Sequence, residues 1–102
     1  MQIIALRTLQ LFWRERPDAE KPLRTWYGIV AQASWNQPAD VKEHFGAAVD
    51  FVADNRLIFN IGGNKYRLIV RVAYEFKAVQ IKFVGTDSEY DKIDPVTCQV
   101  KP

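Results

Sequence analysis

Cysteine and histidine are nearly absent from this 102-residue chain, which holds one of each, Cys98 and His44. A single cysteine excludes an internal disulfide framework and fits a reducing compartment. One histidine and one cysteine are too few for a zinc site of any usual kind, and we expect no metal or other cofactor. The chain lacks an apolar run of about 18 residues, the length of a membrane-spanning helix, and its first residues do not open like a signal peptide. We therefore expect a cytoplasmic protein without membrane contact.

The composition that remains is typical of one globular domain covering residues 1–102. Hydrophobic residues make up 48% of the chain and charged residues 25%, which excludes intrinsic disorder. Aromatic residues make up 13%, enough large side chains for a small core. We expect the three tryptophans to lie in that core and His44 to be a packing or rim residue.

Positive charge is concentrated in one segment, although the net charge is only +2. Residues 56–85 hold six lysines and arginines against the single acidic Glu75, a net charge of +5. Such a segment is typical of an anion-binding surface. It is equally typical of a solvated strand face on which lysines prevent edge-to-edge aggregation. The charge pattern alone leaves both interpretations open.

The hydrophobic periodicity predicts helices first and strands later. Leu23, Trp26, Tyr27 and Val30 follow the spacing of a helix over 18–33. Pro17 separates that helix from another over 6–16, and Pro38 opens a short helix over 37–45. Strands are expected at residues 2–5, 49–53, 56–61, 65–74 and 78–84. This order indicates an α+β fold, with an N-terminal helical hairpin packed on a C-terminal antiparallel β-sheet.

Turn chemistry predicts how the strands pair. A two-residue turn at Gly62-Gly63 would place Phe59 opposite Tyr66. A tight turn near residues 76–77 would place Arg71 opposite Lys82 and residue 67 opposite residue 86. Like charges directly opposite cost about 0.2–1 kcal/mol, and a phosphate bound between them would reverse that repulsion. The outer face of the sheet then carries Arg56, Asn60, Lys65, Arg67, Arg71, Gln80 and Lys82.

Five polar side chains would converge at one end of this face: Arg67, Arg71, Lys82, Asp87 and Tyr90. Cations stabilise charge on a phosphate, while a carboxylate or phenol can move protons. An RNA phosphodiester attacked by its own 2′-hydroxyl needs no other groups. The residues alone do not separate RNA cleavage from plain RNA binding.

Two strings of residues carry a family resemblance. The stretch FNIGGNKYRLIVRV (59–72), and KFVGT (82–86) followed by EYDKID (89–94), resemble the HigB-type toxins of the RelE/ParE superfamily. The resemblance covers the whole chain and implies a RelE-like toxin of a type II toxin–antitoxin system. Such toxins are ribosome-dependent mRNA endonucleases. A helix-turn-helix antitoxin neutralises the toxin and represses the operon with it, so that the toxin meets operator DNA only indirectly.

The resemblance assigns roles to residues of this chain. Arg67, Lys82, Asp87 and Tyr90 are the candidate catalytic residues. The resemblance also maps a basic position of the family onto Arg71, a candidate RNA-binding residue. The other candidate RNA-binding residues, Arg56, Lys65, Asn60 and Gln80, come from the predicted outer face of the sheet.

Asp87 departs from the family pattern, because a histidine commonly follows the threonine of this string. Three interpretations stay open: Asp87 takes the role of base, the position is not essential, or the enzyme is weakened. Pro95 is a second, milder departure and is expected to end the last helical turn. Two other functions also stay open, a toxin that binds a protein target such as gyrase, and an RNA-binding module without catalysis.

Overall fold

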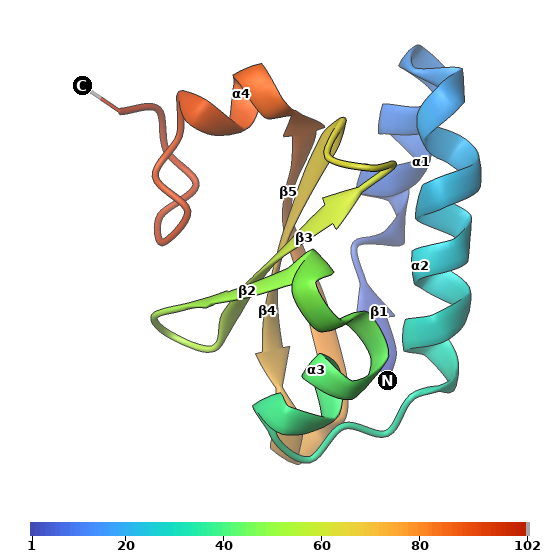
Figure 1. Ribbon diagram of the computed structural model, residues 1–102, viewed down its shortest axis with the longest axis vertical. Helices are drawn as coiled ribbons and strands as arrows, with labels where there is room; N and C mark the ends of the chain where they lie inside the picture. The colour runs from blue at the N-terminus through green and yellow to red at the C-terminus, as the bar shows by residue number, and fades with distance from the viewer. Residues whose placement is uncertain (102) are drawn as a thin grey trace.

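The computed structural model describes residues 1–101, which form a helical layer against one face of a five-stranded sheet (Figure 1). The elements follow in the order β1 (Gln2–Ile4), α1 (Leu6–Glu15), α2 (Glu20–Gln32), α3 (Pro38–Phe45), β2 (Val49–Val52), β3 (Arg56–Ile61), β4 (Tyr66–Ala73), β5 (Ala78–Thr86) and α4 (Asp87–Asp91). The predicted α+β fold is confirmed. No helix among residues 1–101 is long and apolar enough to cross a membrane.

The two N-terminal helices form the predicted hairpin, with ends within two residues of the expected ones. Pro17 begins a short 3₁₀ turn that joins α1 to α2. On α2, Leu23, Trp26 and Val30 are the buried residues, at the spacing of one helix face. Apolar periodicity therefore located this layer correctly.

The sheet is mixed, whereas the sequence predicted an antiparallel one. The strand order is β1-β5-β4-β3-β2, and strands β2 to β5 pair with one another in antiparallel fashion. β1 pairs in parallel with the first residues of β5. After β1 the chain passes through the helices and enters the sheet at the far edge. Three hairpins then bring it back to β5, which runs in the same direction as β1.

The β3–β4 hairpin differs from the predicted one by two residues. Its loop comprises residues 62–65, and Phe59 pairs with Leu68 instead of Tyr66. Gly62, Gly63 and Asn64 all have positive φ, of 63°, 64° and 77°, so the turn continues past the glycine pair. Because the shift is an even number of residues, the side chains stay on their predicted faces.

The β4–β5 pairing also differs from the prediction. The connection takes four residues, 74–77, because a 3₁₀ turn precedes Lys77 with a φ of 53°. A β-bulge then shifts the register, with Val70 opposite Ile81 and Ile69 opposite Phe83, so that Lys82 is the extra residue of the bulge.

The two shifts change the partners of both arginines on β4. Arg71 lies opposite Gln80 instead of Lys82, and Arg67 lies opposite Gly85 instead of Thr86. The like-charge pair predicted from the sequence is therefore wrong. The real pair of opposed cations is Arg56 and Arg71.

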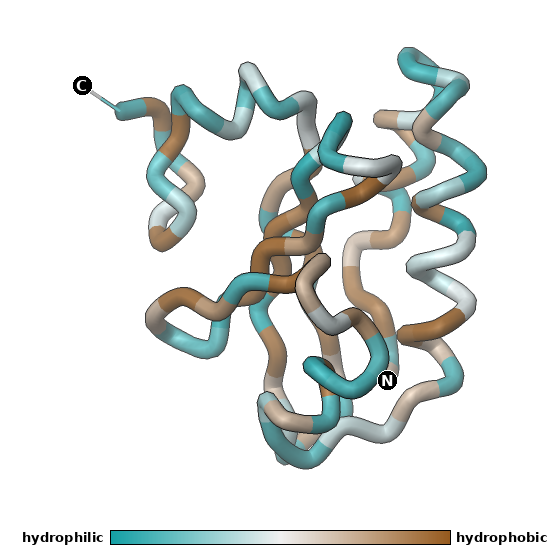
Figure 2. Tube along the Cα trace, viewed as in Figure 1, coloured by the Kyte–Doolittle hydropathy of each residue, from teal (hydrophilic) through white to brown (hydrophobic). Residues whose placement is uncertain are grey.

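Two apolar clusters lie on the two faces of the sheet. The larger fills the space beneath the helices and includes Trp26 and Trp35, 2% and 1% exposed. Trp13 packs against its edge, where the Arg24 guanidinium lies 4.9 Å from the ring. His44 accepts a 2.9 Å hydrogen bond from Trp35 Nε1, which confirms it as a rim residue. Figure 2 shows apolar positions concentrated along the central strands.

The smaller cluster lies on the outer face, which the sequence predicted to be open. Ile58 and Ile69 are covered there by the C-terminal segment, through Ile93 and Cys98. α4 ends at Asp91, four residues before Pro95, where the sequence placed the end of the last helical turn. Residues 92–101 then fold back on themselves, with a bridge between residues 93 and 100.

Candidate functional site

Arg67 is held in place at the end of the outer face by contacts in several directions. Its Nη2 lies 3.0 Å from Asp87 Oδ1. Its Nη1 donates to the carbonyl oxygens of Asn64 at 3.0 Å and Tyr66 at 3.3 Å. The Arg67 side chain is 17% exposed and that of Asp87 is 54% exposed. The guanidinium orientation is therefore fixed while the carboxylate stays open to solvent.

Tyr90 completes this group, which we call the Arg67 cluster: Arg67, Asp87 and Tyr90. The guanidinium carbon of Arg67 lies 5.9 Å from the centre of the Tyr90 ring. Tyr90 is half-buried against the outer-face apolar cluster. This burial raises the pKa of the Tyr90 phenol, although the charge of Arg67 acts in the opposite direction. The phenol is consequently protonated at neutral pH.

A capping box places α4, and with it Asp87 and Tyr90. The Thr86 hydroxyl accepts from the Glu89 backbone N–H at 3.2 Å, and the Glu89 carboxylate accepts from the Thr86 backbone N–H at 2.8 Å. The bond from the Thr86 backbone lowers the pKa of Glu89. The backbone N–H of Asp87 also donates to the Lys65 carbonyl at 3.2 Å, which joins α4 to the β3–β4 loop.

Gly85 allows α4 and β5 to approach closely beside the cluster. A Cβ added at Gly85 would lie 2.6 Å from Cζ of Phe83 and 3.2 Å from Cβ of Glu89. Gly85 pairs with Arg67 on β4, so this close packing lies next to the guanidinium. A glycine at this position therefore has a packing role in the site.

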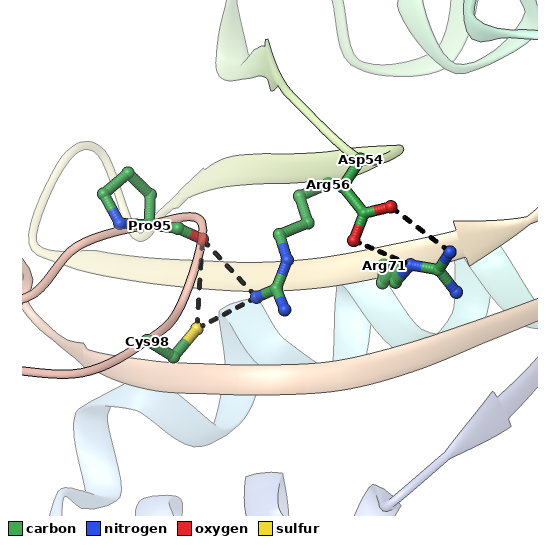
Figure 3. A network of polar contacts seen from close by, with 5 residues as sticks. All are labelled: Asp54, Arg56, Arg71, Pro95 and Cys98. Carbon is green, nitrogen blue, oxygen red and sulfur yellow. Dashed lines mark hydrogen bonds and ion pairs between the residues drawn. The ribbon is translucent and has the colours of Figure 1, made fainter.

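Arg71 and Arg56 do not join the Arg67 cluster. Arg71 lies four residues along β4 from Arg67, about 13 Å away. Asp54 contacts it twice, at 3.3 Å to Nε and 3.4 Å to Nη2 (Figure 3). Arg56 Nη1 faces Cys98 Sγ at 3.3 Å and the Pro95 carbonyl at 3.5 Å. The predicted convergence of Arg67 and Arg71 at one end of the face is thus wrong.

The other predicted site residues divide between the two sides of the sheet. Asn60 pairs with Arg67 across β3 and β4, and Gln80 is exposed on β5. Lys82, half-buried at the bulge, has no carboxylate within ion-pair distance among residues 1–101. Lys65 was expected on the outer face. It instead lies in the β3–β4 loop, 3.1 Å from the Asp18 carboxylate.

Sequence reasoning missed the carboxylates that accompany the basic residues. Asp18 lies in the turn between α1 and α2, where it accepts from the Tyr66 hydroxyl at 2.5 Å as well as from Lys65. Asp54 lies in the turn between β2 and β3, with a φ of 63°. Strand alternation does not place side chains that belong to turns. The only signal for Asp54 was the short gap between the strands predicted at 49–53 and 56–61.

The helical layer and the mixed sheet, with the Arg67 cluster at one end of the outer face, define a small α+β protein. A family model described as HigB toxin, the RelE-like toxic component of a toxin–antitoxin system, matches residues 19–93. The chain belongs to this HigB toxin family, as the resemblance predicted. The matched segment contains β2 to β5 and the whole Arg67 cluster. Membership implies an antitoxin as partner.

Curated relatives cover nearly the whole chain at modest identity. The chain is 27% identical over 92 residues to the mRNA interferase toxin HigB of Escherichia coli strain K12, with 89% of this chain and 88% of that protein covered. An mRNA interferase HigB of Shigella flexneri is equally similar. Another from Escherichia coli strain CFT073 is 23% identical, with 91% of both chains covered.

Proposed function

We propose that this protein is an mRNA interferase, a toxin that cleaves mRNA on translating ribosomes in the cytoplasm and so blocks translation. The relatives named above carry that activity in their names. The single observation that carries the proposal is the Arg67 cluster, which combines a fixed cation, an open carboxylate and a protonated phenol. These are the groups that an attack of the RNA 2′-hydroxyl on its own phosphate requires.

Each member of the cluster has one task in this reaction. Arg67 binds the scissile phosphate and stabilises the charge that develops on it. Asp87 accepts the proton of the 2′-hydroxyl as the new O–P bond forms. The bond to the 5′-oxygen breaks, and that oxygen takes a proton from the phenol of Tyr90. The products are a 2′,3′-cyclic phosphate and a 5′-hydroxyl.

Further residues contact the RNA around the scissile phosphate in this proposal. Lys82 supplies a second cation from the bulge of β5, a position from which bulges often direct side chains into active sites. Asn60 and Gln80 offer amide groups on the same face. Arg56 and Lys65 already contact other groups of the chain, and each must exchange a partner to bind RNA.

Cleavage in a translation extract tests the proposal. Primer extension on a reporter mRNA should show new 5′ ends with the wild-type chain, which Arg67→Ala and Tyr90→Phe abolish. Intact mRNA with the wild-type chain would overturn the proposal. DNA breaks with continuing translation would indicate a gyrase-type target. Salt-sensitive RNA binding without cleavage would indicate a plain RNA-binding module.

The proposed antitoxin is a helix-turn-helix protein that brings this toxin to operator DNA. We expect it to cover the outer face, or the groove between helices and sheet, and to shield Arg67 and Lys82. A complex in which both side chains keep their solvent exposure would indicate that the antitoxin blocks ribosome access instead.

A further inference from the structure

One cavity of this protein lies away from the Arg67 cluster, and the proposed reaction does not use it. It has a volume of about 290 Å³ and lies where β4 runs past the beginning of β3. Asn55 of the β2–β3 turn lines one side, and its carbonyl accepts from the Val72 backbone N–H at 3.0 Å. The other side is lined by residues 71–76, which include Arg71, Glu75 and Phe76. We call this cavity the Arg71 notch.

The charges in the notch do not favour a phosphate. Both carboxylate oxygens of Asp54 contact the guanidinium of Arg71, and Glu75 adds a second negative charge. Figure 3 shows the Asp54 carboxylate facing Arg71, with both contacts drawn. The notch therefore has no net positive charge, and a neutral polar ligand suits it better than an anion.

The shape and chemistry of the notch suit a flat ligand. Because Asp54 fixes two nitrogens of Arg71, the guanidinium plane is held in one orientation, and such planes stack on nucleobases. Phe76 is 77% exposed and offers an aromatic ring at the rim. A single exposed aromatic residue needs no explanation by itself. Here it accompanies the Arg71 guanidinium and Asn55 around one cavity.

We propose that the Arg71 notch binds one unpaired nucleobase of the mRNA, an inference that rests on the proposed function. The base stacks on Phe76 and the Arg71 plane, and its edge hydrogen-bonds to Asn55 and Glu75. A carboxylate accepts hydrogen bonds from exocyclic amino groups, so the notch favours adenine, cytosine and guanine over uracil. Arg71 and Arg67 share one face of β4 about 13 Å apart. The bound base consequently belongs to a different nucleotide from the phosphate at Arg67.

Substitution of Phe76 tests this assignment without disturbing the fold, because the side chain is mostly solvent-exposed. Phe76→Ala should weaken binding of a single-stranded oligoribonucleotide at least about fivefold, the lower end of the effect of losing one stacked base. Phe76→Tyr keeps the ring and should bind like the wild type. Val100→Ala is the matched control, since Val100 is equally exposed at 77% and lies outside the notch.

Fluorescence anisotropy with oligomers that carry one abasic position locates the base. The wild-type chain should bind the oligomer that is abasic at one particular position more weakly than it binds the intact oligomer. Phe76→Ala should bind these two oligomers with equal affinity. Uracil at that position should bind more weakly than the other bases, and Glu75→Gln should reduce this preference.

Equal binding by the wild type and Phe76→Ala, or by all abasic oligomers, would overturn the notch assignment. Primer extension in the translation extract reports separately on the proposed function. If Phe76→Ala changes neither the positions of cleavage nor KM, the notch assignment is wrong and the proposed nuclease function is unaffected. If RNA binding depends on the position of the abasic site but no cleavage occurs, the nuclease proposal is wrong and the notch assignment stands.

Discussion

Asp87 is the proposed proton acceptor of the cleavage reaction, and its substitution tests that role. If its carboxylate takes the proton of the attacking 2′-hydroxyl, Asp87→Asn removes the acceptor while it keeps the shape of the side chain. The amide oxygen can still accept a hydrogen bond from Arg67 Nη2, now 3.0 Å from the carboxylate. We therefore expect the cluster to stay assembled and the chemical step to slow.

We expect Asp87→Asn to have a large effect on the rate of cleavage and a small effect on the stability of the fold. Positioned acid–base catalysis contributes about 10²- to 10⁴-fold, and we expect cleavage by Asp87→Asn to fall by at least about 100-fold. The Arg67–Asp87 pair contributes little to folding, because an ion pair with a carboxylate 54% exposed is worth about 0–1 kcal/mol. A change of about 1 kcal/mol in the free energy of unfolding is the most that the variant should show.

The assay measures single-turnover cleavage of a reporter mRNA in a translation extract, with urea unfolding as the measure of stability. Asp87→His supplies a different base, whose side chain normally ionises near pH 6.5. We expect Asp87→His to cleave RNA, with a rate that falls as the pH drops through that range, while the wild-type rate shows no such fall. A wild-type rate in Asp87→Asn, with unchanged stability, would refute the role of Asp87 as base.

Three further predictions concern the surroundings of the site. Gly85→Ala places a Cβ 2.6 Å from the Phe83 ring, and urea unfolding should show a loss of about 1–3 kcal/mol together with slower cleavage. Glu89 has a pKa held below its usual 4.5 by a backbone hydrogen bond. Its contribution to stability is present above that pH and is lost as pH falls through the lowered pKa, so Glu89→Gln should flatten the acid side of the stability profile measured by thermal melting. The hydrogen bond to Asp18 raises the pKa of Tyr66, and a spectrophotometric titration should find that one tyrosine titrates at lower pH in Asp18→Asn than in the wild type.

The sequence predicted the helical layer and the strands well because both depend on local periodicity. The spacing of Leu23, Trp26 and Val30 identifies the buried face of α2 without knowledge of its partner. Strand alternation likewise places Arg67 and Arg71 on the outer face. The structure begins α4 with a capping box of Thr86 and Glu89, a signal that the prediction of a helical turn over 87–91 did not use.

Register was less predictable, because it depends on turn conformations and on a bulge. Asn64 and Lys77 take positive φ, which costs residues other than glycine some energy and is not evident from the flanking strands. Each lengthens its loop beyond the two residues that the turn chemistry predicted. The bulge at Lys82 then reduces the difference from the predicted pairing from two residues, at Arg71, to one residue, at Arg67. Together these changes remove the predicted Arg71–Lys82 pair. The distance between Arg71 and Arg67 does not depend on register, because both lie on β4, four residues apart.

The outer face illustrates a second limit of sequence reasoning. The basic residues were correctly identified, but their partners come from distant segments. Asp54 neutralises Arg71 from a turn, and the C-terminal segment contacts Arg56 through Pro95 and Cys98. Nothing in the alternation of β3 and β4 indicates that residues 92–101 cover part of that face.

The central claim is that the Arg67 cluster cleaves RNA by attack of the neighbouring 2′-hydroxyl. The most direct measurement is the chemistry of the new RNA ends, recovered from a translation extract treated with the wild type or Arg67→Ala. We expect 5′-hydroxyl ends paired with 2′,3′-cyclic phosphates for the wild type, and none for Arg67→Ala. Intact mRNA with the wild type, 5′-phosphate ends, or equal cleavage by both proteins would contradict it.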